Sequence, residues 1–137
     1  MNFRYVFLIL KGNNFTYNTA VNGGALYLEN GTVVSGIDNE FYYNNATMYG
    51  GAIYCADSAT LNLYNSKFYN NTAQYGGAIK LNGTIKAYNS IFVNNTAYNG
   101  GAIHIDVGAP TINNCTFFKN TATYRGGAIW NSAASGT

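Results

Sequence analysis

The chain is built from five copies of one sequence block, and this repetition restricts its fold more than any other feature. Each copy has a Phe, an Asn three residues later, an Ala two residues after that, and then a Gly-Gly-Ala-Ile or Gly-Gly-Ala-Leu segment. The first glycines of these segments are Gly23, Gly50, Gly76, Gly100 and Gly126, so the copies recur about every 26 residues. Such a period is typical of a solenoid, in which each repeat buries its apolar face against its neighbours.

Within each copy the apolar residues alternate with other residues instead of recurring at helical spacing. Ile53 and Cys55 are two positions apart, as are Ile79 and Leu81. This spacing predicts short β-strands and no amphipathic helix. Three short strands per copy, joined by Asn- and Gly-rich corners, predict one coil of a parallel β-helix, so we expect an all-β solenoid of about five coils.

Two sets of equivalent residues are expected to stack from coil to coil. The first is the column Phe15, Phe41, Phe68, Phe92 and Phe117. The second is an asparagine ladder made by Asn18, Asn44, Asn71, Asn95 and Asn120. A short amide side chain tolerates a left-handed backbone and can hydrogen-bond to its counterpart one coil away, so we expect the ladder at a left-handed corner.

Composition excludes several classes of partner. The hydrophobic content of 47% can supply a core, whereas only 9% of residues are charged, where about a quarter is usual. The net charge of +2 is spread along the chain and forms neither a basic stripe nor a polybasic patch. We therefore expect no nucleic-acid partner, and without about 20 consecutive apolar residues we expect no membrane insertion of this segment.

Both ends of the sequence continue the repeat pattern. Leu8 and Leu10 precede Phe15 by the offsets that Leu61 and Leu63 have before Phe68, which places residues 3–10 in the first coil. Gly126 begins a further strand set that stops without a capping element. We interpret residues 1–137 as one β-helix segment of a longer protein whose neighbouring coils are its partners. The alternative for residues 1–10 is a signal-peptide hydrophobic region, although no small-residue cleavage site follows.

The paired Gly-Gly-Ala-Ile and Phe-x-x-Asn signatures resemble the repeats of the chlamydial polymorphic outer-membrane proteins and of adhesin-like surface proteins from other microbes, including archaea. This resemblance covers nearly the whole chain. It implies a right-handed parallel β-helix in the exported part of a surface protein, often an autotransporter passenger. The implied location is the cell surface, the outer membrane or the exterior, and the implied role is adhesion.

One column is the best candidate for binding a ligand. The residues directly after the Gly-Gly-Ala-Ile/Leu blocks are Tyr27, Tyr54, Lys80, His104 and Trp130. Alternation predicts that they point away from the core, where aromatic rings can bind sugars or a protein surface. The alternative is that these aromatic residues only favour strand formation and cross-strand packing.

Neither a metal nor a cofactor is expected. The single histidine, His104, has only Asp106 nearby in sequence and no second His or Cys at ligand spacing. Cys55 and Cys115 occupy different columns more than two coils apart, which is too far for a disulfide, so we expect buried thiols. Seven Asn-x-Thr sequons follow from the Asn-rich turns and leave glycosylation undetermined.

Parallel β-helices also support carbohydrate-cleaving enzymes, which need two suitably spaced carboxylates. Glu29 and Asp106 share a column but are three coils apart, whereas Asp38 and Glu40 are two residues apart and would lie about 7 Å from each other on one strand. Glu40 is expected to face Lys67, which favours a solvated surface pair. We predict a non-enzymatic, adhesin-like segment. The alternatives are part of a polysaccharide lyase or glycoside hydrolase whose catalytic coils lie elsewhere, and a spacer without a ligand.

Overall fold

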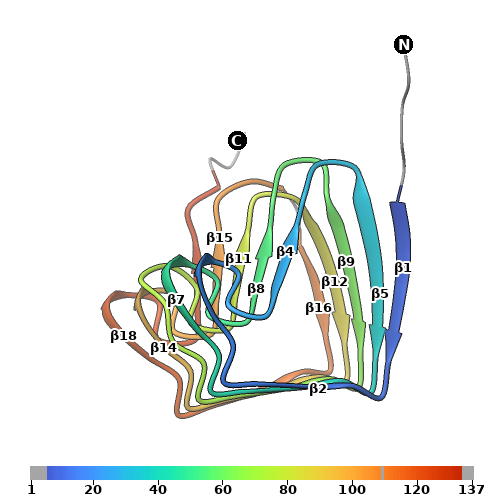
Figure 1. Ribbon diagram of the computed structural model, residues 1–137. Coiled ribbons are helices and arrows are strands. Elements are labelled where there is room, and N and C mark those ends of the chain that lie inside the picture. Colours follow the sequence, from blue (N-terminus) through green and yellow to red (C-terminus); the bar gives the residue numbers. More distant parts are fainter. Residues whose placement is uncertain (1–5, 109, 134–137) are drawn as a thin grey trace.

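The protein is a stack of five β-strand coils, which confirms the predicted all-β parallel solenoid. The computed structural model describes residues 6–108 and 110–133. Strands of successive coils lie side by side along one axis, and the coils are viewed end-on in Figure 1. The described part of the chain contains no helix that is long and apolar enough to cross a membrane. Residues 3–5 and 134–137, for which the sequence predicted part of a first coil and an uncapped tail, lie outside the described residues.

Three five-stranded parallel sheets form the walls of the solenoid, and each coil contributes one strand to each sheet. The first sheet contains β1 (Val6–Lys11), β5 (Thr32–Ile37), β9 (Thr60–Tyr64), β12 (Thr84–Tyr88) and β16 (Thr111–Asn113). The second contains β2 (Asn14–Thr16), β6 (Glu40–Tyr42), β10 (Lys67–Tyr69), β13 (Ile91–Val93) and β17 (Thr116–Phe118). The third contains β4 (Leu26–Leu28), β8 (Ile53–Cys55), β11 (Ile79–Leu81), β15 (Ile103–Ile105) and β19 (Ile129–Asn131).

Each coil also has a fourth extended segment, which the three-strand prediction missed. It lies between the Asn corner and the Gly-Gly corner and forms the lobe on the left of Figure 1. Its strands are β3 (Thr19–Asn22), β7 (Asn45–Tyr49), β14 (Thr96–Asn99) and β18 (Thr121–Arg125). In the third coil only single bridges through Thr72 and Tyr75 join this segment to its neighbours. The register is irregular here, so the sequence shows no clean two-residue alternation.

The phenylalanine column is a continuous stack inside the solenoid. Adjacent rings are nearly coplanar, with centroids 4.6 to 4.8 Å apart, which equals the spacing of neighbouring strands. Phe41, Phe68 and Phe92 are at most 1% exposed. Identical rings one strand spacing apart fill the same volume in every coil, which explains why the position keeps one residue type.

The asparagine ladder forms a chain of hydrogen bonds next to the phenylalanine stack. The backbone N–H and the Nδ2 of Asn44 both donate to Oδ1 of Asn71, at 2.9 and 3.1 Å. Nδ2 of Asn44 also donates to the carbonyl of Phe15 in the preceding coil. The same pattern repeats at Asn71 and Asn95, so the polar groups of this buried corner are paired between coils.

The left-handed residue at this corner directly precedes the ladder asparagine, and the expectation that the ladder asparagines are themselves left-handed is wrong. The preceding positions have φ between 54° and 57°, and they are Tyr17, Tyr43, Asn70, Asn94 and Lys119. A left-handed residue turns the chain so that the next side chain points inward. Asn65, Asn89 and Asn114, at a second corner, are left-handed as well.

The Gly-Gly corner requires glycine at both positions. Gly76 has φ +69°, a conformation that L side chains rarely adopt. Gly77 has an ordinary φ, but a Cβ there would lie 2.1 Å from the carbonyl oxygen of Gly101 in the next coil. The corners of successive coils therefore pack backbone against backbone, which brings the fourth segment close to the third sheet.

Candidate functional site

The predicted ligand column lies on the outer face of the third sheet, but its middle is covered. Tyr27, Tyr54, Lys80, His104 and Trp130 are in register on consecutive strands. Tyr27 is 50% exposed and Tyr54 is half-buried, whereas Lys80 is only 2% and His104 only 5% exposed. The prediction of one continuous ligand-facing column is therefore wrong for Lys80 and His104.

Two tyrosines of the fourth segment cover the middle of this column. Tyr49 and Tyr75 directly precede the Gly-Gly corner, which brings them back over the third sheet. The Nζ of Lys80 lies 5.2 Å from the centre of the Tyr49 ring, a cation–π contact. The rings of Tyr75 and His104 are 5.4 Å apart. Alternation gives the direction of a side chain relative to the solenoid core, but it does not show what packs on the outside.

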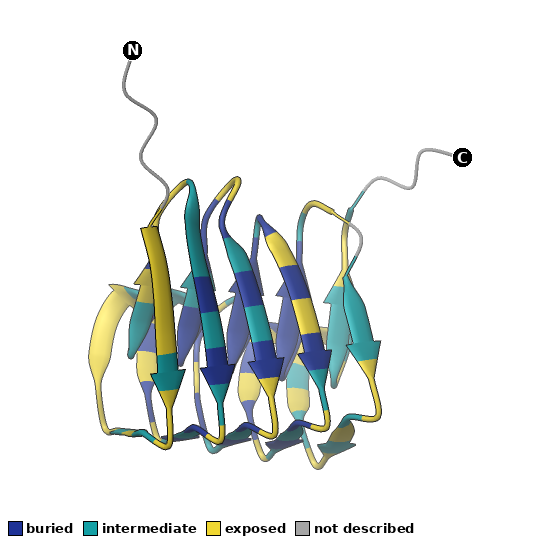
Figure 2. Ribbon diagram, turned by 90° about the vertical axis from the view of Figure 1, so that its right-hand side faces the viewer, coloured by how far each residue is buried: buried dark blue, intermediate teal, exposed yellow. Residues whose placement is uncertain are grey.

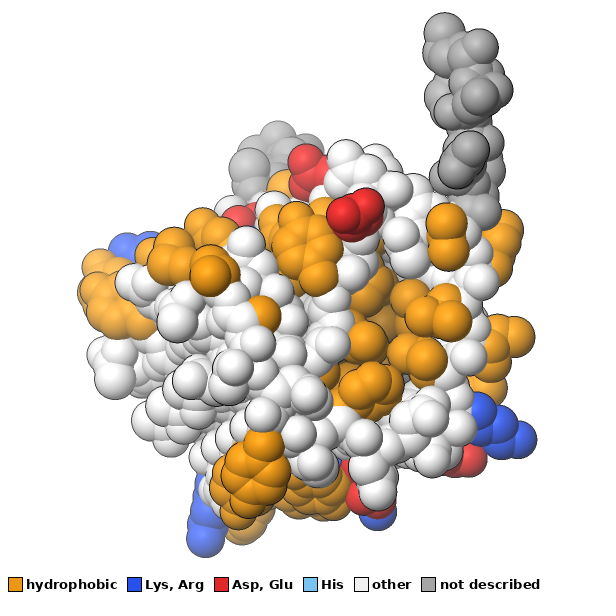
Figure 3. Space-filling model, viewed as in Figure 1, with side chains coloured by type: hydrophobic (Ala, Val, Ile, Leu, Met, Phe, Trp, Pro, Cys, Tyr) orange, Lys and Arg blue, Asp and Glu red, His pale blue; other side chains and the backbone are white. Residues whose placement is uncertain are grey.

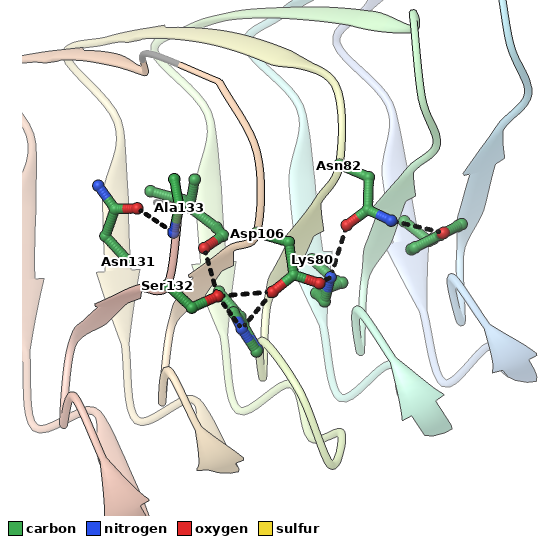
Figure 4. Close-up of polar contacts among 9 residues, drawn as sticks. Lys80, Asn82, Asp106, Asn131, Ser132 and Ala133 are labelled. Atoms are coloured by element: carbon green, nitrogen blue, oxygen red, sulfur yellow. Dashed lines mark hydrogen bonds and ion pairs between the residues drawn. The ribbon is translucent and has the colours of Figure 1, made fainter. Parts of the chain in front are cut away.

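Lys80 is the centre of a polar network on this face (Figure 4). Its Nζ donates to Oδ2 of Asp106 at 2.5 Å and to Oδ1 of Asn82 at 2.6 Å. Asn82 Nδ2 in turn donates to the hydroxyl of Tyr54 at 3.3 Å. A buried ammonium group needs such partners because burial removes its hydration. The network thus links three consecutive coils through β8, β11 and the end of β15.

Asp106 connects this lysine to a histidine and a serine. Its Oδ1 lies 2.9 Å from His104 Nε2 and accepts a hydrogen bond from the Ser132 hydroxyl at 2.7 Å. His104 Nε2 also lies 3.4 Å from Ser132 Oγ, while His104 Nδ1 is buried without a partner among the described residues. In a catalytic triad the two imidazole nitrogens contact different groups, one the nucleophile and the other the carboxylate. This cluster therefore lacks the geometry of a triad.

The environment shifts the ionisation of both groups. Burial lowers the pKa of His104, and the charge of Lys80 lowers it further, against the opposing effect of Asp106. Burial raises the pKa of Asp106, but the hydrogen bonds from Lys80 and Ser132 and the charge of Lys80 outweigh it, and the pKa is lowered overall. At neutral pH these shifts favour an ionised Asp106 and a neutral imidazole.

An open pocket of about 330 Å³ adjoins the exposed end of the column, near the first coil. Tyr27, Glu29, Asn30 and Ala56 line it. The rings of Tyr27 and Tyr54 are 4.9 Å apart and tilted by 54°. An aromatic surface beside a carboxylate and an amide is a combination that binds sugars, because the ring packs against C–H groups and the polar atoms bond hydroxyls.

Asp38 and Glu40, the two acids that the sequence places close together, do not lie along one strand. Glu40 contacts Lys67 at 3.2 Å, as the sequence indicated. Asp38 does not lie on the same strand as Glu40, because β5 ends at Ile37 and β6 begins at Glu40. Asp38 is an exposed, left-handed corner residue with φ 55°. The assumption that the two acids extend along one strand is therefore wrong.

The cysteines have structural positions in different columns. Cys55 is buried in register with Leu28 and Leu81, and Cys115 is half-buried; both are free. Burial raises the pKa of the Cys55 thiol to about 12, so this thiol remains protonated. Within residues 6–108 and 110–133, no three His, Cys, Asp or Glu side chains are placed to hold a metal ion.

Sequence reasoning missed the residues that complete this site. Tyr49 and Tyr75 both directly precede a Gly-Gly pair. This shared position was a signal in the sequence that two tyrosines pack next to the third sheet. Asn82 and Ser132 share a column with Glu29 and Asp106, since each follows the third sheet's strand at the same offset. Their contacts to Lys80 and His104 depend on side chains from different coils, which no single copy of the repeat reveals.

The family comparison agrees with the architecture. Residues 4–137 match the family described as right handed beta helix region, and the chain belongs to this family. Neither the curated proteins nor the solved structures that were compared gave a significant match.

Proposed function

We propose that this chain is a non-catalytic, adhesin-like β-helix segment that is displayed on a cell surface or secreted, and that it binds a carbohydrate at Tyr27, Tyr54 and the adjoining pocket. The observation that carries the proposal is the position of Tyr27, 50% exposed and beside Glu29 and Asn30 in the pocket. The rigid coil stack holds this aromatic surface in place, so binding requires little ordering of the protein.

The repeat motifs support a more specific assignment. We propose that the repeats are of the polymorphic outer-membrane type, because both signature motifs have a defined structural role. The Phe and Asn of Phe-x-x-Asn form the inner stack and the ladder, and the Gly-Gly-Ala-Ile segment forms the close-packed corner. Outer positions vary between coils without disturbing these features, which is a useful property for a recognition surface.

A glycan array with matched tyrosine variants tests the binding site. Tyr27→Ala should remove carbohydrate binding, because the ring provides the exposed aromatic surface at the pocket. Tyr17→Ala is the control, since Tyr17 is also an exposed tyrosine of the first coil but lies at the Asn corner, whereas Tyr27 lies on the third sheet. Equal binding by wild type and Tyr27→Ala, or equal losses in both variants, would contradict the proposed site.

Soluble polysaccharides incubated with the protein test the non-catalytic part of the proposal. We expect binding without release of shorter products. Cleavage would instead support the alternative of a carbohydrate-active enzyme. Protease treatment of intact source cells tests the location. A surface-displayed protein should be degraded while the cells remain intact, and a secreted protein should be found in the culture medium.

A further inference from the structure

The asparagines of this chain divide into two groups that differ in burial and in sequence context. The buried ones, at most 9% exposed, begin no Asn-x-Ser/Thr sequon, and they are Asn39, Asn44, Asn71, Asn95 and Asn99. The sequons of the inner three coils begin at exposed or half-buried residues, which are Asn45, Asn70, Asn82 and Asn94. In these coils a buried alanine follows each ladder asparagine by two residues, so it excludes a sequon at the ladder position.

A sequon on an extended segment presents its first and third residues on the same side. Asn45 and Thr47 are both exposed on β7, whereas Ala46 between them is 2% exposed. Figure 2 shows the same banding of exposed and buried residues along the strands of the first sheet. A glycosyltransferase that recognises the amide and the hydroxyl of a sequon can therefore reach both groups of this sequon on the folded chain.

Asn45 occupies a strand position that is threonine in every other coil. Its equivalents in register are Thr19, Thr72, Thr96 and Thr121. Threonine is enriched in strands, whereas asparagine is depleted. Asn45 does not have the positive φ at which asparagine is favoured, and its side chain forms no hydrogen bond within the described part of the chain, unlike that of Asn44. Local structure therefore does not explain an asparagine here, whereas a sequon does.

Asn94 begins a second open sequon, at the corner before the ladder. Asn94 is exposed, Asn95 is fully buried in the ladder, and Thr96 is exposed at the start of β14. Asn94 has φ 55°, a left-handed conformation that by itself favours asparagine. Asn45 is therefore the stronger of the two observations.

The sequon at Asn82 differs from these two because its amide is already engaged. Asn82 is half-buried, its Nδ2 donates to the Tyr54 hydroxyl at 3.3 Å, and its Oδ1 accepts from Lys80 at 2.6 Å. Nδ2 is the atom to which a sugar would be attached. The folded structure thus separates open sequons from a closed one.

The surface around Asn45 is apolar and poor in charge. Only 9% of all residues are charged, and Figure 3 shows few charged side chains on the face that it displays. The fourth segment, which includes β7, exposes Val21 by 60%, Tyr98 by 44% and Tyr124 by 57%. A glycan is bulky and solubilising, so one attached to Asn45 would cover part of this apolar lobe.

We propose that Asn45, and with it Asn94, is N-glycosylated, which rests on the exported location proposed above. The transfer joins Nδ2 of the asparagine to the anomeric carbon of a sugar that is carried on a lipid phosphate. The bond from this carbon to the phosphate oxygen breaks, the lipid phosphate leaves, and Nδ2 loses one proton. Asn82 remains unmodified in the folded chain, because Tyr54 and Lys80 hold its amide.

Mass spectrometry of the protein recovered from the surface or the medium of its source cells tests these sites. Chymotrypsin cleaves after aromatic residues and gives peptides 44–49 and 93–98, which contain Asn45 and Asn94. Both peptides should carry the mass of a glycan and release sugar fragment ions on dissociation. Peptide 76–88, which contains Asn82, should keep its unmodified mass.

Threonine variants produced in the source cells distinguish a recognised sequon from an exposed asparagine. Thr47→Ala retains Asn45 but should remove its glycan completely, whereas Thr47→Ser keeps the sequon and should keep the glycan. The matched control is Thr121→Ala, which changes an exposed threonine that is in register with Thr96 but belongs to no sequon. This control should leave both glycans in place.

Two kinds of failure can be told apart. An exterior protein whose peptide 44–49 is unmodified, or a Thr47→Ala variant that keeps the glycan, would overturn the glycosylation site and leave the exported location intact. A glycan at Asn82 with none at Asn45 would overturn it as well. A protein confined to the cell interior would contradict the exported location and, with it, the glycosylation.

Discussion

Two columns of five residues run along the same solenoid, and only the inner one keeps a single residue type. The inner column consists of five phenylalanines. The outer column on the third sheet consists of Tyr27, Tyr54, Lys80, His104 and Trp130, with exposures from 50% at Tyr27 to 2% at Lys80. Both columns have the same strand spacing and register, so neither strand geometry nor repeat period explains the difference.

The difference lies in what surrounds each column. The inner column is enclosed by the other walls of the same coil, so its volume is fixed and each ring must match the next. Only the middle of the outer column is covered by side chains of the fourth segment. Tyr49 and Tyr75 cover Lys80 and His104, while Asp106 and Asn82 provide polar partners. One coil can therefore change its outer chemistry without changing its fold.

The largest effect is expected from the inner column. Phe68→Ala removes a fully buried ring from the middle of the stack and should lower the free energy of unfolding by about 3–5 kcal/mol. Chemical denaturation measures this loss. Tyr69→Ala, on the same strand but pointing outward and half-buried, should cost clearly less. Similar losses for both would show that inner and outer columns have equal weight.

The next largest effect is expected from the ladder. Asn71→Ala leaves the N–H of Asn44 and the carbonyl of Phe41 without their buried partners. Because each buried group without a partner costs about 1–3 kcal/mol, the loss should be about 2–4 kcal/mol in a denaturant titration. Asn45→Ala, the control, changes an exposed asparagine whose side chain makes none of these bonds. A change no larger than that of the control would mean that the ladder is not a source of stability.

A smaller effect is expected from the covered part of the outer column. Asp106→Asn leaves the ammonium group of Lys80 buried without its carboxylate. The loss should be about 1–3 kcal/mol, below that of a fully buried pair because Asp106 is 41% exposed. The matched control is Asp57→Asn in an exposed turn. Thermal melts of both variants at neutral pH provide the comparison, and equal midpoints would show that solvent screens the pair.

The smallest effect is expected from the ionisation of His104, the only histidine of the chain. Its pKa is lowered in the folded state, first by burial and then by Lys80, so the unfolded chain binds this proton more readily. The free energy of unfolding should therefore decrease as the pH falls below about 6.5 and through the folded-state pKa. His104→Gln should remove this dependence between about pH 7 and about pH 5, while the loss from protonating Asp106 follows at lower pH. An unchanged pH profile in the variant would assign the slope to other groups.

The repeat alone determined the solenoid, its five coils and the stacked Phe column, because a residue that recurs with the coil period must face its own copies. The tertiary structure decided which turn residue is left-handed, where the fourth strand runs, and that Tyr49 and Tyr75 bury Lys80 and His104. These features depend on contacts between different positions of different coils. Periodicity relates only equivalent positions, so the contacts that shape the outer site follow from the folded chain and not from the pattern.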